Sequence, residues 1–443
     1  MHGGLGKEWK RHMKEYRKYA EEMLEFIDKS PTGFHAVANL AAALEEQGFR
    51  RLKESQAWEL AAGEGCYVTR NDSSLIAFRL PAKDRAAGFH IAASHADSPT
   101  FKVKEAPEMP AENAYVKLNT EKYGGMILSS WLDRPLSVAG RVVAEGEKGI
   151  ETRLVNIDED MMVIPSVAIH MGRDAANKEY NPQVDMLPLY GECGEEGKAA
   201  AAHAFLDRIA GEAGTEAERI LGHDLFLYVR EKGRILGRNG EFVLSSRLDD
   251  LQCVYASSRA FLDSTPEDYI NVCVVFDNEE VGSGTKQGAD STFLEDVLWR
   301  IGESMHLSRS EYLQLIAGSF LISADNAHAV HPNHPEKADP TNRPFLNRGI
   351  VLKFHGSQKY ATDAVSAAQV RMLCREAGVP CQAYANRSDI AGGSTLGNIS
   401  TSHVSVSSAD IGLPQLAMHS AVETAGVKDT KYAVDMFRVF FAK

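Results

Sequence analysis

The sequence lacks any apolar run long enough to span a bilayer, and its first residues, MHGGLGKEWKRHMKEYRKYAEEMLEF, lack the apolar core of a secretory signal. We therefore expect a cytoplasmic protein that does not enter a membrane. Cysteine is also scarce: the six cysteines are scattered, with no CxxC pair and no disulfide-like framework. We expect them to be reduced packing residues rather than structural cross-links.

Positive charge is in short supply as well. The chain has 48 Lys and Arg against 61 Asp and Glu, a formal net charge of −13, which argues against a nucleic-acid-binding surface. Low-complexity tracts and blocks of like charge are missing, and 44% hydrophobic with 25% charged residues is typical of a globular protein. A chain of 443 residues predicts two or three domains, with small-molecule or peptide substrates as the best fit.

What the chain does contain is an alternation of strand and helix patterns. Short apolar runs predict buried strands at 88–94, 270–276, 319–323 and 414–418, and the run at 270–276 is rich in β-branched residues. Apolar residues at helical spacing predict helices within 10–50, 248–263 and 363–378. This order predicts an α/β fold, with a sheet flanked by helices.

The stretch from about 100 to 236 interrupts this alternation. It has many glycines, strand-like pieces such as SVAGRVVAE, TRLVNI and MVIPSVAIH, and one helical pattern near KAAAAHAFLDRIAGEAG. We interpret 100–236 as an inserted, β-rich domain. The first domain would then be discontinuous, formed by 1–99 and 237–443.

Residues that can bind metals follow the expected strands. They are His95, Asp97, Glu279, Glu280, Asp325, His328 and His419, and Asp249 and Asp250 join them at the start of an expected helix. Sites in open α/β sheets form at the carboxyl ends of strands, so these residues are candidates for one site. Imidazole and carboxylate without thiolate favour a catalytic zinc, cobalt or manganese centre, at which a bound water becomes the nucleophile.

Each motif also has a structural interpretation. The histidine of HAD can be capped by its acid in a turn, paired glutamates often lie on a solvated face, and acids such as Asp250 favour a helix N-terminus. His328, His331 and His334 could form a surface cluster. The pair Glu279–Glu280 is harder to explain in this way, because a buried strand precedes it and VGSG turns sharply afterwards.

Read together, the motifs SHADSPTFKVK, YGGMILSSWLDRPLSVAGRV, SSRLDDL, FDNEEVGSGTKQGA, SADNAHAVHPNHP and MHSAVE resemble those of the M18 aminopeptidases, over nearly the whole chain. The resemblance implies the dinuclear zinc exopeptidase fold, with a mixed, largely parallel sheet and an inserted β-rich dimerisation domain. It also implies removal of N-terminal residues from peptides, and two zinc ions per subunit that cobalt or manganese can replace.

The resemblance assigns roles to individual residues. His95 and Asp325 would hold one zinc, Glu280 and His419 the other, and Asp249 would bridge them. Glu279 would be the general base beside a zinc-bridged hydroxide, and Asp97 would orient the His95 imidazole. Where relatives often have Asn after the bridging acid this chain has Asp250, so the role of Asp250 stays open.

Further roles concern the substrate and the assembly. His170 resembles a histidine that relatives contribute to the active site of a neighbouring subunit, within a homo-oligomeric dodecamer built from dimers. Lys353, Tyr360 and His328 resemble residues near the substrate pocket, although a solvated lysine and a half-buried tyrosine are the alternative interpretations. An acidic N-terminal residue is one possible preference, and a neutral or hydrophobic one is another.

Two other functions compete with this hypothesis. One is a related dinuclear zinc deacylase or carboxypeptidase, which would share the paired acids and the HxD motif. The other is a metal-binding shell or cargo protein without catalysis. The long YGGMILSSWLDRPLSVAGRV match argues against the first, and the complete set of ligands and base argues against the second.

Overall fold

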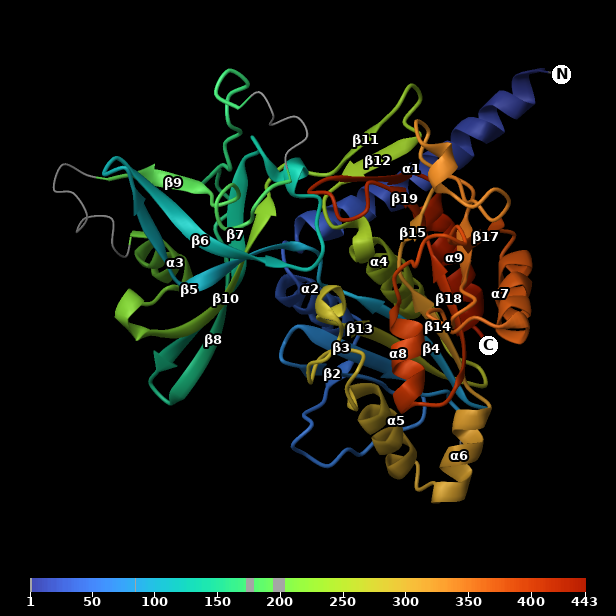
Figure 1. Ribbon diagram of the computed structural model, residues 1–443. Helices are drawn as coiled ribbons and strands as arrows, with labels where there is room; N and C mark the ends of the chain where they lie inside the picture. Colours follow the sequence, from blue (N-terminus) through green and yellow to red (C-terminus); the bar gives the residue numbers. More distant parts are fainter. Residues whose placement is uncertain (1, 84, 173–178, 194–203) are drawn as a thin grey trace. The chain divides into compact units, whose positions relative to one another are not determined.

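The computed structural model describes residues 2–83, 85–172, 179–193 and 204–443 (Figure 1). The chain divides into two compact units. The first comprises Met1–Asp97, Gly233–Met418 and Glu423–Lys443, and the second comprises Ser98–Lys232 and His419–Val422. Among the described residues, no helix is long and apolar enough to cross a membrane.

A nine-stranded sheet organises the first unit. Its order is β1 (Arg50–Arg51), β2 (Gly65–Arg70), β3 (Ser74–Arg79), β13 (Ile270–Phe276), β4 (Phe89–His95), β14 (Phe320–Ala324), β18 (Ser407–Gly412), β16 (Ile350–Phe354) and β17 (Cys381–Ala385). The four strands β13, β4, β14 and β18 run parallel at its centre, and antiparallel pairs flank them. The predicted mixed, largely parallel α/β sheet is therefore confirmed.

Helices cover both faces of this sheet. They are α1 (His2–Asp28), α2 (Gly33–Glu46), α4 (Leu248–Asp263), α7 (Ala364–Glu376) and α9 (Asp429–Phe441) against one face, and α5 (Phe293–Ser304), α6 (Arg309–Ala317) and α8 (Leu396–His403) against the other. Successive residues of β13 alternate between the two cores: Cys273 and Val275 join one, Val272 and Val274 the other. Because helices cover β13 on both faces, its sequence INVCVVF is apolar almost throughout instead of alternating with polar residues.

A smaller sheet completes the first unit. It contains β11 (Arg234–Leu236), β12 (Phe242–Ser245), β20 (Glu423–Gly426), β19 (Pro414–Leu416) and β15 (Ala327–His328). The expected strand at 414–418 thus exists in shorter form and lies in this sheet. Strand β18, which no sequence pattern predicts, takes the place beside β14 in the large sheet.

The second unit contains a six-stranded antiparallel sheet. Its order is β8 (Gly149–Asn156), β7 (Leu136–Gly146), β10 (Ile220–Val229), β5 (Thr100–Ala111), β6 (Tyr115–Tyr123) and β9 (Leu189–Glu192). Helix α3 (Ala204–Ala213) places Phe205 and Ile209 in the core of this unit. The strand-like piece at 162–170 forms only isolated bridges at Met162 and Val163, because Pro165 has no N–H to continue a ladder.

Candidate active site

Three adjacent parallel strands end at one edge of the large sheet. His95 is the last residue of β4 and pairs with Phe276, the last residue of β13, while β14 runs along the other side of β4. The turn that carries Glu279 follows β13, and Asp325 follows β14. The polar side chains therefore gather at the carboxyl ends of the strands, where α/β sheets form their sites.

These side chains lie close enough to share metal ions. Ligand atoms of His95, Asp249 and Asp325 lie within 4.8 Å of one another, and so do those of His95, Glu279 and Glu280. The Nε2 atom of His95 is 3.6 Å from Oδ1 of Asp249, and both side chains are buried. One imidazole among several carboxylates is a donor set that suits zinc and its neighbours in the first transition row.

Asp97 fixes both the glutamate turn and the histidine. Its carboxylate accepts the backbone N–H of Glu279 at 3.1 Å and that of Glu280 at 3.1 Å, one on each oxygen. The Nδ1 atom of His95 lies 3.1 Å from the Asp97 carbonyl oxygen and 3.4 Å from its Oδ1. The sequence predicts the contact with His95 but not the two bonds to the turn, which hold the glutamates in place.

The LDD segment presents its two acids differently. Asp249 has non-helical backbone angles (φ −81°, ψ 107°) at the start of α4, and its N–H donates to the buried carboxylate of Glu423 at 3.0 Å. Asp250 is fully buried, and its Oδ2 accepts the backbone N–H of His95 at 3.4 Å. Asp249 thus lies beside the imidazole nitrogen, whereas Asp250 lies beside the backbone of the same residue.

Burial and mutual repulsion shape the charges of this cluster. Burial raises the pKa of Glu279 to about 7, although the nearby His95 lowers it, and burial with the Asp249 charge raises the pKa of Glu280 well above its usual range. Burial lowers the pKa of His95, but the Asp249 and Asp97 carboxylates outweigh it and raise that pKa well above 6.5. A site so crowded with acids fits bound cations, which compensate the negative charge.

The residues expected near the substrate lie on the adjoining strands. Lys353 on β16 is only 3% exposed, its Nζ is 3.6 Å from Oδ1 of Asp325, and it lies over the Tyr360 ring at 5.5 Å. The interpretation of Lys353 as a solvated lysine is therefore wrong, and Tyr360, at 6% exposed, is buried rather than half-buried. His328 is exposed and lines a cavity of about 470 Å³.

Two buried residues near the site have no role predicted from the sequence. Asn326 donates to the Leu248 carbonyl at 3.0 Å and to Gln415 at 2.7 Å, and so joins the strand end of β14 to the LDD segment. Asp410 on β18 lies fully buried near Lys353. Asn326 stands within the quoted motif SADNAH, whereas Asp410 has no such signal until β18 is placed in the sheet.

His170 and His419 belong to the second unit. His419 has a left-handed backbone (φ 65°), and its carbonyl accepts the N–H of Ile127 at 3.0 Å. His170 lies exposed in a turn, between Ile169 and Met171, which are 71% and 84% exposed. The roles assigned to both histidines remain predictions from the sequence.

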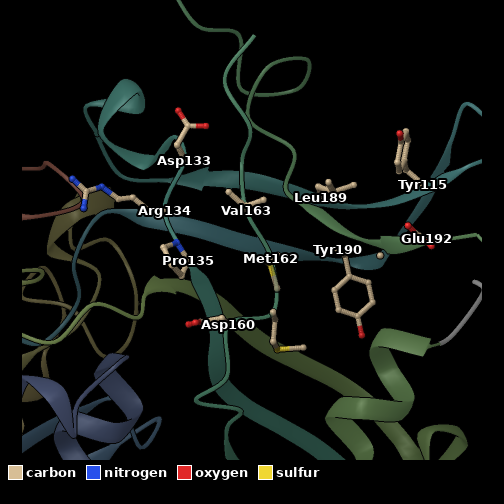
Figure 2. A pocket seen from close by; sticks show the side chains of 12 residues that line it. Tyr115, Asp133, Arg134, Pro135, Asp160, Met162, Val163, Leu189, Tyr190 and Glu192 are labelled. Carbon is tan, nitrogen blue, oxygen red and sulfur yellow. The ribbon is translucent and has the colours of Figure 1, made fainter. Parts of the chain in front are cut away.

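A cavity of about 490 Å³ lies within the second unit (Figure 2). Asp133, Asp160 and Glu192 contribute acids to its lining, and Met162 and Tyr190 contribute apolar surface. Asp133 accepts hydrogen bonds from Ser166, and Asp160 accepts one from Arg230. None of the predicted ligands or catalytic residues lines this cavity.

Comparisons with known proteins agree with this geometry. The chain matches the family described as Aminopeptidase I zinc metalloprotease (M18) over residues 26–441. It is 48% identical to a probable M18 family aminopeptidase 2 of Clostridium novyi over 433 residues, which are 97% of this chain and 100% of that protein. A probable M18 family aminopeptidase 2 of Pseudomonas aeruginosa is 42% identical, over 95% of this chain and 97% of its own length.

Solved structures resemble the chain over its full length. The structure of the Ape4 and Nbr1 complex matches with a TM-score of 0.92 and 35% identity, over 100% of this chain and 87% of that one. The S. cerevisiae mApe1 dodecamer matches with a TM-score of 0.83 and 28% identity, over 96% of this chain and 97% of that one. With its acids and histidine gathered at the strand ends of the same fold, this chain belongs to the M18 family and is a metallo-aminopeptidase.

Proposed function

We propose that the enzyme removes N-terminal residues from peptides with two zinc ions held at the strand ends of the first unit. His95 and Asp325 would hold one ion, Glu280 and His419 would hold the other, and Asp249 would bridge them. The observation that carries this proposal is the cluster of buried and half-buried side chains, in which His95, Asp249, Glu280 and Asp325 belong to overlapping groups of ligand atoms within 4.8 Å. Cobalt or manganese, which accept the same ligands, can replace zinc.

When bound, the zinc ions supply a Lewis acid and lower the pKa of coordinated water. The chain's own acid–base group is Glu279. Its neighbour Glu280 serves as a ligand, whereas the Glu279 carboxylate takes a proton from the attacking water and delivers it to the leaving amine. Asp97 positions both glutamates for these roles, because its carboxylate accepts the backbone N–H of each and its carbonyl oxygen lies 3.1 Å from Nδ1 of His95.

Acidic N-terminal residues are the preferred substrates in this proposal. The cavity of about 470 Å³ has the cations Lys337 and Arg387 in its lining, with His328, against the single carboxylate of Asp339. Asp389 pairs with Arg387 at 2.7 Å and compensates part of its charge, so Lys337 carries more of this argument. Lys353 acts less directly than the sequence predicts, because its ammonium group already pairs with Asp325.

A neutral or hydrophobic preference is the second candidate. The same cavity has Tyr384, Ile390 and Leu416 in its lining, which would accept an apolar side chain. The two candidates differ in charge, so substrates of similar size but different charge separate them.

The assembly is a cytoplasmic homo-oligomer, a dodecamer built from dimers, in which the inserted domain makes the dimer contact and His170 acts in a neighbouring subunit. The similar S. cerevisiae mApe1 chain is part of a dodecamer, which supports this assembly by analogy. Exposed Val167, Ile169 and Met171 around His170 support burial of this segment against another subunit. An active enzyme with the solution mass of a monomer would contradict this assembly.

The test is a panel of acidic, neutral and basic aminoacyl-p-nitroanilides. Turnover is measured after chelation and again after zinc, cobalt or manganese is restored, with the bound metal counted per chain. We expect chelation to abolish turnover, metal to restore it, and the aspartyl and glutamyl substrates to give the largest kcat/KM. Two metals per chain without turnover of any substrate would contradict the proposed mechanism, and a larger kcat/KM for leucyl or alanyl substrates would favour the second candidate.

A further inference from the structure

A single buried carboxylate, that of Asp410, contacts several segments around the expected substrate pocket. Asp410 lies in the middle of β18, is 0% exposed, and is the register partner of Ser323 on β14, two residues before Asp325. A buried ionisable side chain destabilises the folded state unless hydrogen bonds and opposite charges compensate the loss of its hydration. Its partners therefore indicate what the carboxylate does.

The first partner is the segment that follows Tyr360. The N–H of Ala361 donates to Oδ2 of Asp410 at 2.6 Å. The Asp410 N–H donates to the hydroxyl of Thr362 at 2.8 Å. Asp410 thus holds the two residues that follow Tyr360 through its side chain and its backbone. The Tyr360 ring itself contacts the His355 ring edge-on, with 5.7 Å between the ring centroids.

The second partner is the loop 386–395, which lies within the stretch ANRSDIAGGSTLG and has no role predicted from the sequence. Thr395, at the start of α8, donates its hydroxyl to Oδ1 of Asp410 at 2.5 Å. Two residues later, a Cβ at Gly397 would overlap the Asp410 carboxylate, so this position accepts only glycine at the present spacing. The far end of the loop supplies Asn386, Arg387 and Ile390 to the lining of the cavity of about 470 Å³.

The third partner is Lys353, whose ammonium group lies in the electrostatic field of Asp410 as well as beside Asp325. Gly412, two residues after Asp410, permits this approach: a Cβ there would lie 3.0 Å from Cε of Lys353 and would overlap the carbonyl of Asp325. The lysine is thus held between two acids from neighbouring strands. One acid is a proposed ligand, and the other is Asp410.

We propose that Asp410 is a positioning residue for the substrate pocket, holding Lys353, the Tyr360 segment and the end of the loop 386–395 in one arrangement. This inference rests on the proposed role of that pocket in binding the N-terminal residue. Among the described residues, the hydrogen bonds of Asp410 go to Ala361, Thr362 and Thr395 and not to the proposed ligands, so its loss should change recognition more than chemistry. The prediction is a change in KM and in side-chain selectivity, with bound metal retained.

The central experiment compares Asp410→Asn with wild type. The amide keeps the size of the side chain but removes the negative charge. Thr395 and Ala361 donate to different oxygens of Asp410, and an amide presents an oxygen to only one of them. We expect KM for the preferred p-nitroanilide to rise about tenfold and kcat to change by about threefold or less, because misplaced binding groups chiefly weaken ground-state binding. The ratio of kcat/KM between acidic and neutral substrates should fall as well.

The matched control is Asp429→Asn. Asp429 is also fully buried and accepts two backbone N–H groups, from Asn347 at 2.6 Å and Gly349 at 2.9 Å, but it lines neither the cavity nor the metal cluster. This variant should lower the melting temperature like Asp410→Asn and leave KM and selectivity unchanged. An equal shift of KM in both variants would contradict the proposal, because Asp410 would then act only on the stability of the fold.

A second pair of variants keeps the test valid if Asp410→Asn folds poorly. Thr395→Val removes the hydroxyl that donates to Asp410 and should reproduce the KM shift to a smaller extent, whereas Thr395→Ser restores the donor and should return KM to the wild-type value. A Thr395→Val enzyme with unchanged KM and selectivity would overturn the inference. Loss of bound metal in Asp410→Asn would overturn it too, because Asp410 would then support the metal centre instead of the pocket. Absence of turnover in wild type would instead refute the proposed function.

Discussion

Strand β4 contains two buried histidines, five residues apart, in opposite surroundings. His90 is sandwiched by aromatic rings: its ring centroid is 3.6 Å from that of Tyr269 and 4.3 Å from that of Phe440, and its Nδ1 lies 2.8 Å from the Phe440 carbonyl. His95 ends the strand among the carboxylates of Asp97, Asp249 and Asp250.

The two environments move the imidazole pKa in opposite directions. Burial lowers the pKa of His90 to about 4, whereas the carboxylates around His95 overcome burial and raise its pKa. Both residues are buried histidines, so their neighbours determine whether the imidazole is a neutral packing group or a charged group of a site. Unlike charges brought together at strand ends therefore identify a site better than its histidines alone.

Substitution of the acids around His95 should have the largest effects. Glu279→Gln should retain both metals and lose about 100-fold to 10,000-fold in kcat, because it removes a proton-transfer group from the reaction. Glu280→Gln should lose one metal, since an amide is a poorer ligand than a carboxylate. Turnover of a p-nitroanilide and metal content per chain distinguish the two roles, and full activity with two metals in both variants would contradict them.

Asp97→Asn tests the support of the site with a smaller expected effect. The amide can accept only one of the two N–H groups of Glu279 and Glu280, and it no longer places a charge beside His95. We expect metal affinity to fall about 10-fold to 100-fold, which is typical for loss of a residue that orients a ligand. Asp429→Asn is again the control, and equal metal affinity in the two variants would remove Asp97 from this role.

The titration of His90 should change the stability of the fold with pH but should not change catalysis. The folded-state pKa of about 4 lies below the ordinary value of 6.5, so its contribution to stability is present above pH 6.5 and is lost as the pH falls toward 4. The loss is up to about 3 kcal/mol for a shift of this size. His90→Phe keeps the stacking and removes this titration.

Denaturant unfolding of wild type and His90→Phe at several pH values measures the effect. The variant should be less stable above pH 7, because the bond to the Phe440 carbonyl is lost at about 1 kcal/mol, and should approach or exceed wild type below pH 5. Its kcat at neutral pH should equal that of wild type. Parallel stability curves for the two proteins from pH 7 to pH 4 would show that His90 does not titrate as proposed.

Much of the fold follows from local sequence patterns. INVCVVF and LDDLQCVYASSRAFLD have the apolar content and periodicity of β13 and α4, and the observed elements have the predicted bounds. MVIPSVAIH has similar apolar content but contains Pro165, and its structure is mostly irregular. The sequence does not predict strand β18, because its polar residues Ser407, Ser408 and Asp410 interrupt the apolar pattern that is typical of a buried strand.

The site was predictable to the extent that its motifs are contiguous. HAD, LDD and NEE each place an acid or histidine at a strand or helix end, and the structure gathers them in one cluster. What the sequence could not supply are contacts between distant segments, such as the Asp97 carboxylate on two backbone N–H groups or Asp410 beside Lys353. Those contacts depend on strand order, which no local pattern specifies.

Strand order also has a consequence for protein synthesis. Strand β18 lies between β14 and β16 in the sheet, although it follows both in the chain. On the ribosome, residues 320–324 and 350–354 therefore emerge before the strand that belongs between them, and the central sheet cannot close until residue 412 has been translated. Since Asp325 and Lys353 flank that gap, a nascent chain cannot complete the arrangement around these two residues before β18 has been translated.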